Sequence, residues 1–232
     1  GNQRLTGTLG VERRMSERST LSLNATAERV EFDDESVSSN YDRQSGYLEY
    51  AMQGARTNLS VRAGGTVLHD YGDTTNGPLL NLTVERQVTA RSTLTLNAGT
   101  ELTDSADAMR RAQQIGGIDL DGGNPIVSTD QFQSDFVSLA WALEGARTTL
   151  DLAVDLRSED YERDTTFNRD AIGATASLVR RLSARLSWRL YGGWSKQDFD
   201  RSDVDFDEWN AGTGFDWLLT ETVGVTLTGE RF

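Results

Sequence analysis

Glu85-Arg-Gln-Val-Thr-Ala-Arg-Ser-Thr-Leu-Thr-Leu-Asn-Ala-Gly-Thr-Glu-Leu102 alternates apolar and polar residues around a short polar turn. After the turn, Leu94, Leu96 and Ala98 share one parity, and the polar residues between them share the other. This period of two is that of a β-strand with one apolar and one polar face. The segment before the turn alternates in the same way, so the stretch predicts a β-hairpin.

The turn of this hairpin recurs along the chain. Its copies are Met15–Leu21, Gly54–Leu59, Thr89–Leu94, Gly145–Leu150 and Ser183–Leu186, with a degenerate sixth copy at Thr220–Val223. Longer connections rich in Asp, Ser, Gly and Asn lie between them, at 33–44, 69–77, 103–131, 159–168 and 197–208. The pattern predicts twelve strands, at 5–14, 20–32, 45–53, 58–68, 79–88, 93–102, 132–144, 149–158, 169–181, 186–196, 209–219 and 223–232.

Short turns alternate strictly with long connections, so all short turns should lie at one end of the sheet. Bacterial outer-membrane barrels have this pattern, with short periplasmic turns and long extracellular loops. A soluble β-sandwich meets the same water at both ends and gives no reason for it. We predict an all-β, antiparallel up-and-down transmembrane β-barrel of about 12 strands, one domain over residues 1–232, in the bacterial outer membrane. The chain ends at Phe232 as outer-membrane proteins often do, but the alternate positions Glu230, Thr228 and Thr226 are polar where an assembly signal would be apolar. If the chain continues beyond Phe232, twelve strands is a lower bound.

Composition narrows the function classes. The net charge of −13 argues against a nucleic-acid partner, and the absence of cysteine excludes disulfides and thiolate metal sites. The mean hydropathy of −0.51 is typical of a soluble protein. A transmembrane β-barrel, however, places its apolar side chains at every second residue only. Low mean hydropathy is therefore compatible with a membrane location.

The parity opposite to the apolar one carries most of the strand charge. A charge facing lipid near the bilayer midplane costs about 2–4 kcal/mol, so we predict that the apolar parity faces lipid and the charged parity faces a lumen. The predicted lumen-lining residues are Glu12, Glu28, Glu49, Arg62, Glu85, Glu101, Glu144, Asp151, Asp155, Arg157, Arg189 and Asp216.

Arginines near the short turns fall on both parities. Arg13, Arg86 and Arg180 lie on the apolar parity, at a depth where long cationic side chains reach lipid head groups. The predicted periplasmic rim lies on the charged parity and consists of Arg18, Arg56, Arg91, Arg147 and Arg185. We favour pairing of these five with neighbouring glutamates in ladders; an unpaired basic rim is the alternative.

Aromatic residues are expected to form two girdles at the membrane interfaces. The girdle near the short turns would contain Tyr50, Trp141, Trp188 and Trp217. The girdle near the long connections would contain Phe32, Tyr41, Tyr71, Phe132, Tyr161, Phe199 and Trp209. The alternative is that these are core aromatics of a soluble sheet.

Few residues suggest catalysis or cofactor binding. The carboxylates of Asp198–Glu208 could converge on a divalent cation such as Ca²⁺, although the segment lacks EF-hand spacing and we favour a solvated acidic loop. His69 is the only histidine, and no His-x-Ser arrangement surrounds it. We expect no enzyme activity, no catalytic or cofactor-binding residues, and no cofactor beyond that candidate cation.

The pattern around the short turns, seen at Arg86–Leu96 and Arg181–Leu190, resembles an outer-membrane β-barrel porin family associated with bacterial exopolysaccharide gene clusters. The resemblance implies a transport role in a Gram-negative envelope, with exopolysaccharide secretion as the linked process and envelope polysaccharide or export machinery as partners. It transfers no functional residue to this chain.

Three functions stay open. The first is a porin-like channel or export-associated barrel with an acidic, cation-favouring lumen. The second is a non-conducting structural or surface-binding barrel, plugged by side chains or by the loop 103–131, that displays acidic extracellular loops. The third is a soluble carbohydrate-binding β-domain. For the first two, the expected partners are outer-membrane lipid and lipopolysaccharide, with divalent cations bridging acidic loops to phosphate.

Overall fold

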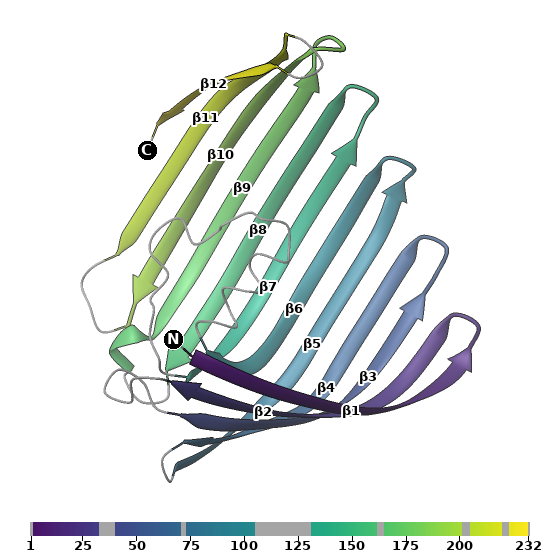
Figure 1. Cartoon of the computed structure of the whole chain (residues 1–232), viewed down its shortest axis with the longest axis vertical. Helices are drawn as coiled ribbons and strands as arrows, with labels where there is room; N and C mark the ends of the chain where they lie inside the picture. The colour runs from purple at the N-terminus through teal and green to yellow at the C-terminus, as the bar shows by residue number, and fades with distance from the viewer. Residues whose placement is uncertain are drawn as a thin grey trace.

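The computed structural model describes residues 2–32, 40–70, 73–104, 131–161, 165–200, 205–219 and 223–231. These residues form twelve strands and one short 3-10 helix (Figure 1). The strands are β1 (Asn2–Ser16), β2 (Ser19–Phe32), β3 (Tyr41–Gln53), β4 (Thr57–Asp70), β5 (Asp73–Thr89), β6 (Ser92–Asp104), β7 (Gln131–Glu144), β8 (Thr148–Tyr161), β9 (Arg169–Arg181), β10 (Leu186–Phe199), β11 (Phe206–Leu218) and β12 (Gly224–Arg231), and the helix η1 (Thr165–Phe167) lies between β8 and β9.

All twelve strands belong to one antiparallel sheet, in which each strand is hydrogen-bonded to its neighbours in sequence. This order confirms the predicted up-and-down topology. The two edges are β1 and β12, and no register joins them to each other in the described ranges. In Figure 1, β1 passes in front of the lower ends of β7 and β8, so the sheet curls into a trough whose concave side faces the viewer.

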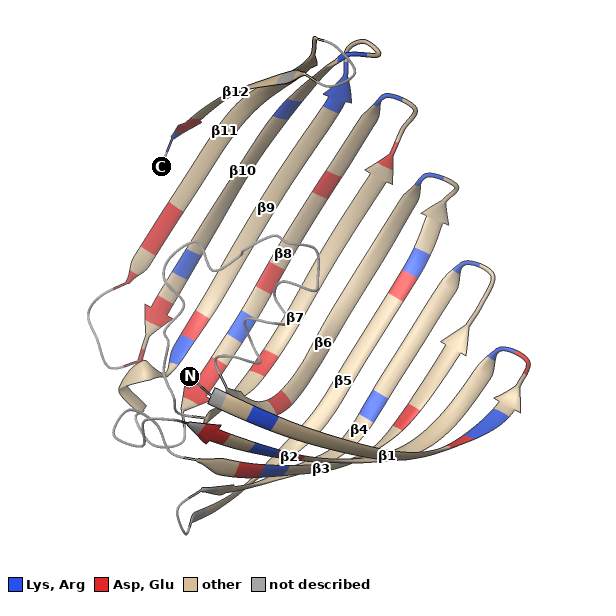
Figure 2. Cartoon of the chain, in the orientation of Figure 1, with Lys and Arg blue, Asp and Glu red and all other residues tan. Residues whose placement is uncertain are grey.

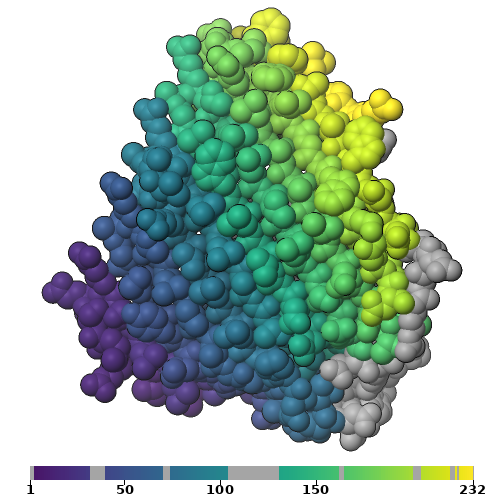
Figure 3. All heavy atoms as spheres, turned by 180° about the vertical axis from the view of Figure 1, so that it is seen from behind, coloured from purple at the N-terminus to yellow at the C-terminus, as the bar shows by residue number. Residues whose placement is uncertain are grey.

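The opposite side of the trough carries no second layer of described structure. Seen from behind in Figure 3, the colours run across the surface in strand order, from purple to yellow. A right-handed twist between neighbouring strands gives a wide antiparallel sheet this curvature. No helix among the described residues is both long enough and apolar enough to cross a membrane.

The strands extend further toward the long connections than the sequence predicts. β3 begins at Tyr41 rather than at 45, and β4 ends at Asp70 rather than at 68. The predicted connection 69–77 is wrong in extent, because β5 begins at Asp73 and pairs with β4 up to Asp70. Polar and glycine residues there are typical of a loop, but pairing with β4 holds residues 73–77 in the sheet.

The short turns repeat one another in structure as they do in sequence. The amide of Gly54 donates to the carbonyl of Thr57 at 2.8 Å, and the amide of Gly145 donates to that of Thr148 at 2.7 Å. A Cβ atom at these glycines would lie 2.9 and 3.0 Å from the same carbonyl oxygens. A side chain at the first position of these two Gly-Ala-Arg-Thr turns would crowd that oxygen, and glycine avoids this contact.

Three other turns use a hydroxyl in the equivalent place. Ser16, Thr89 and Ser183 each accept a hydrogen bond, at 3.2 Å, from the amide two residues later. This side-chain bond adds to the backbone bonds of the turn, since the amide of Ser183 also donates to the carbonyl of Leu186 at 3.0 Å.

The sheet is split at one place near the long connections. The ladder between β5 and β6 stops at Leu80 and Thr100, although β5 stays paired with β4 and β6 stays paired with β7. Pro78 lies in the part of β5 that is bonded on one side only, where a missing N–H is tolerated. Separated from β5, the end of β6 brings Leu102 into a buried cluster with residues of β2, β3 and β4.

Candidate functional site

The two faces of the sheet differ in chemistry. Large apolar side chains lie exposed on the convex outer face: Leu9 is 74% exposed, Leu23 62% and Leu152 39%. Three pairs of oppositely charged register partners lie on the concave inner face, Glu28 with Arg43, Glu49 with Arg62 and Glu159 with Arg169. A continuous apolar outer surface is unusual for a soluble domain and suits contact with lipid. The soluble carbohydrate-binding alternative does not fit this surface.

The strand registers place every predicted lumen-lining residue on the inner face. Glu12, for example, is on the same face as Glu28 of β2, and Asp151 and Asp155 alternate with apolar outer-face residues of β8. The full set is Glu12, Glu28, Glu49, Arg62, Glu85, Glu101, Glu144, Asp151, Asp155, Arg157, Arg189 and Asp216. That this face lines an open lumen stays a prediction.

One buried charge cluster joins the first three strands at the long-connection end. Arg4 Nη1 lies 2.8 Å from Glu28 Oε1, and Arg43 Nη2 lies 2.5 Å from Glu28 Oε2. Arg4 also donates to the hydroxyl of Tyr41 at 3.3 Å. Glu28 is 8% exposed, so its charge is compensated by two cations rather than by water.

A second buried cluster joins β8, β9 and β10 at the same end. Arg169 Nε donates to Glu159 Oε2 at 2.9 Å, and Arg169 Nη1 donates to Gln197 at 3.0 Å. The Tyr161 hydroxyl donates to the same carboxylate oxygen at 3.2 Å, and Arg157 Nη1 lies 3.7 Å from its other oxygen. The side chains of Glu159 and Arg169 are only 2% and 6% exposed.

Sequence reasoning missed three arginines of these clusters, namely Arg4, Arg43 and Arg169. The prediction began the first strand at residue 5 and placed Arg43 in a long connection. All three occupy inner-face register positions. Extending the charged parity by one or two residues beyond the predicted strand ends would have found Arg4 and Arg43, because the strands exceed the length a bilayer requires. Arg169 already opened the predicted strand 169–181 and was not counted on its charged parity.

For four of its seven residues, the predicted girdle near the long connections is wrong. Tyr41, Phe132 and Tyr161 are buried on the inner face, where the rings of Phe132 and Tyr161 have centroids 4.8 Å apart. Phe199 has the inner-face parity of Arg169, and only Trp209 points outward. The side chain of Phe32 and all of Tyr71 lie outside the described residues. Near the short turns, the registers do place the predicted girdle on the outer face: Tyr50, Trp141, Trp188 and Trp217.

The five predicted rim arginines occupy equivalent positions at the short turns. The carbonyl of each accepts a backbone hydrogen bond from the next hairpin, at 2.7–2.8 Å, from Gln53, Gln87, Glu144, Arg181 and Leu218 in turn. Each bond continues a strand ladder by one residue on the inner-face parity. The expected pairing with glutamates is wrong for the described residues, because none of the five side chains forms an ion pair there.

Inner-face aromatic rings lie across glycines of neighbouring strands. A Cβ atom on Gly99 would fall 3.0 Å from the Phe136 ring, and the Tyr191 ring covers Gly212. A Cβ atom on Gly64 would instead meet the backbone of the next strand, namely the carbonyl oxygen of Gly46 and, at 2.6 Å, Tyr47 Cα. The guanidinium of Arg62 lies 5.8 Å from the centre of the Tyr47 ring. Glycine in a strand allows this close approach.

Replacing Gly64 with valine is expected to destabilise the fold by about 1–3 kcal/mol, because the new side chain must displace Tyr47 and the carbonyl of Gly46. Gly46→Val is the matched control, since a Cβ atom at Gly46 meets nothing within 4 Å. Urea unfolding in lipid vesicles, followed by tryptophan fluorescence, measures both changes. Equal losses for the two variants would contradict the packing argument.

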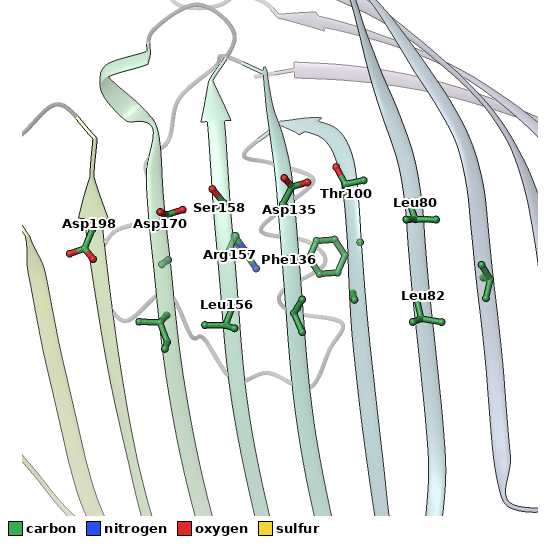
Figure 4. Close-up of a pocket in the computed structure, with 16 residues that line it drawn as sticks. Leu80, Leu82, Thr100, Asp135, Phe136, Leu156, Arg157, Ser158, Asp170 and Asp198 are labelled. Carbon is green, nitrogen blue, oxygen red and sulfur yellow. The ribbon is translucent and has the colours of Figure 1, made fainter.

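A hollow of about 740 Å³ lies on the outer face across β4–β10 (Figure 4). Its polar edge consists of consecutive register partners on β6–β10, namely Thr100, Asp135, Ser158, Asp170 and Asp198. The next row toward the short turns contains Ala98, Val137, Leu156 and Ile172. The outer face thus changes from polar to apolar within one row, which is the profile expected at a membrane interface.

The candidate cation segment is only partly described, because residues 201–204 fall outside the described ranges. Asp198 lies 2.7 Å from Lys196 Nζ, and Asp207 accepts a hydrogen bond from Trp194 Nε1 at 2.7 Å. Within the described ranges no three acidic or histidine side chains converge as a metal site would require. His69 is exposed on the outer-face parity of β4. A divalent cation at this segment stays a prediction.

Solved outer-membrane proteins share this fold. The siderophore receptor PirA from Pseudomonas aeruginosa superposes with a TM-score of 0.63 at 14% identity, over 99% of this chain and 47% of the receptor. The FrpB iron transporter from Neisseria meningitidis gives 0.63 at 10% identity, over 99% and 42%. OmpT, an outer membrane protein of Vibrio cholerae, gives 0.50 at 8% identity, over 99% and 84%.

The chain therefore spans less than half the length of PirA and FrpB. No family model and no curated protein matches it, and nothing in these similarities connects it with exopolysaccharide gene clusters. The similarity shows the fold: an antiparallel sheet of the outer-membrane β-barrel type, which together with the apolar outer surface places the chain in the bacterial outer membrane.

Proposed function

We propose that this outer-membrane β-barrel protein forms the wall of a porin-like channel whose interior favours cations. The supporting observation is a group of inner-face carboxylates, on the strand segments near the short turns, that have no cationic partner. Arg62, Arg157 and Arg189 each have a carboxylate partner, with the closest N–O distances being 3.4, 3.7 and 2.7 Å. Several inner-face acids have no cationic partner among the described residues: Glu12, Glu85, Glu144 and Asp151.

These unpaired carboxylates lie toward the short-turn end, away from the two buried clusters. An inner wall with unpaired carboxylates raises the local concentration of cations. The role proposed is transport rather than catalysis. The partners proposed are outer-membrane lipid and lipopolysaccharide, and a link to exopolysaccharide export rests on the sequence resemblance alone, to be tested by the identity of neighbouring genes.

Single-channel recording in planar bilayers tests the channel. We expect a cation-selective conductance. Its cation-to-anion permeability ratio should fall toward one when Glu85→Gln, Glu144→Gln and Asp151→Asn are combined. The matched control combines Asp135→Asn, Asp160→Asn and Asp170→Asn, which remove the same charge from outer-face positions and should leave selectivity unchanged. Anion selectivity, or equal effects of the two triple variants, would contradict the proposal.

A second candidate is a non-conducting barrel that displays acidic extracellular loops. It is favoured by the filled inner face at the long-connection end, where Val30, Leu68 and Leu102 are no more than 3% exposed. Insertion into bilayers without any conductance would support this second candidate against the first.

A further inference from the structure

The short-turn end of the inner face carries a row of arginines, shown in blue at successive turns in Figure 2. Arg18, Arg56, Arg91, Arg147 and Arg185 are all exposed. Their backbones are held at equivalent positions by the bonds that each carbonyl accepts from the next hairpin. One hairpin separates successive members, so the spacing across the sheet is about 10 Å, or two inter-strand distances.

No direct ion pair neutralises the charge of this row, although the inner-face carboxylates Glu85, Glu144 and Asp151 lie on the neighbouring strand ends. No side chain of the five has an ion pair or a hydrogen-bond partner within the described ranges. Arg181 adds a sixth cation at the position facing Arg147. The acids at the same level are Glu144, which faces Arg91, and Glu17 in the first turn.

Uncompensated cations at a regular spacing attract a chain of anionic groups, because each contact releases counterions. We propose that this arginine row binds an extended linear polyanion at the short-turn mouth of the sheet. The binding of such a polymer requires only the fold and this row, so it does not depend on whether the barrel conducts.

Lipid phosphate is the competing occupant, and the strand parity argues against it. The row continues the inner-face parity, whereas Arg13, Arg86 and Arg180 occupy outer-face positions at the same end. Those three are placed to meet lipid head groups. The five rim arginines are placed toward the concave side, which a soluble polymer can reach.

Fluorescence anisotropy with labelled dextran sulfate tests the proposal on the full chain in non-ionic detergent. The rim variant combines Arg56→Gln, Arg91→Gln and Arg147→Gln, and the matched control combines Arg13→Gln, Arg86→Gln and Arg180→Gln. We expect the rim variant to lose at least about tenfold in affinity and its log–log salt slope to fall by about two to three. The control variant should keep the wild-type affinity, and neutral dextran of equal length should not bind.

Heat-modifiable mobility on SDS gels verifies that both variants are folded, so a loss of binding reports on the row itself. Equal losses in the two variants would overturn the proposal, because any cations at that end would then suffice. Absence of wild-type binding to dextran sulfate, with rim-dependent binding to vesicles of phosphatidylglycerol, would overturn it in favour of lipid phosphate.

Discussion

Replacing Arg169 with methionine is expected to destabilise the folded protein by about 3–5 kcal/mol, because it leaves the buried carboxylate of Glu159 without its closest cation. The two side chains are 6% and 2% exposed, and their N–O distance is 2.9 Å. Methionine fills part of the arginine volume, so the loss reports on charge more than on packing. Denaturant unfolding in lipid vesicles measures the effect.

Two further variants separate charge from shape. Arg189→Met removes one member of a pair whose side chains are 42% and 34% exposed, and water screening should limit its cost to about 1 kcal/mol. The double variant Arg169→Met with Glu159→Leu should be less destabilised than the sum of its single variants, since no unpaired carboxylate remains. Strict additivity would show that the ion pair contributes nothing specific.

The strand count and the identity of the two faces could be predicted from sequence because both follow from a period of two. Alternation such as Leu150, Leu152 and Val154 against Asp151 and Asp155 assigns the faces without knowledge of any register. The turn copies then place all short turns at one end. The apolar outer face and the charged inner face of the structure agree with these predictions.

The long-connection end was less predictable for a physical reason. Beyond the apolar part of each strand, polar residues occupy both parities, so alternation no longer marks where the strand ends. Glu28 and Arg43 become neighbours only through the β2–β3 register, which the hydrophobic pattern does not fix there. Leu102 kept its apolar parity in sequence, yet it turns inward because the ladder between β5 and β6 ends before it.

For the rim arginines, the sequence predicted the face of the sheet but not the partners. Their inward parity was predicted, and the backbone bonds from the neighbouring hairpins agree with it. Their pairing was not, because pairing depends on which residue of the next hairpin faces each turn. Only Arg91 faces an acid, Glu144, and the others face Gln53, Gln87, Arg181 and Leu218.

Placing arginine at position 152 is expected to destabilise the protein in lipid by about 2–4 kcal/mol, whereas arginine at position 153 should change stability little. Leu152 lies in the middle of the outer apolar row of β8, between Leu150 and Val154, and is 39% exposed without lipid. Ala153 is its neighbour on the inner face, and its register partners there are Ala140 and Thr175. The two substitutions add the same charge one residue apart, so their difference isolates the medium that each face meets.

The comparison also decides the orientation of the whole sheet. In a soluble barrel the apolar face points inward, so Leu152→Arg would bury a charge in a core in any solvent, and its cost would persist in detergent-free buffer. In the membrane orientation the cost should shrink when lipid is exchanged for short-chain detergent, whose loosely packed tails let the guanidinium reach water. Unfolding of both variants in vesicles and in detergent therefore separates the two orientations. A larger loss of stability for Ala153→Arg than for Leu152→Arg in vesicles would reverse the assignment of faces in every strand, because all twelve strands belong to one sheet.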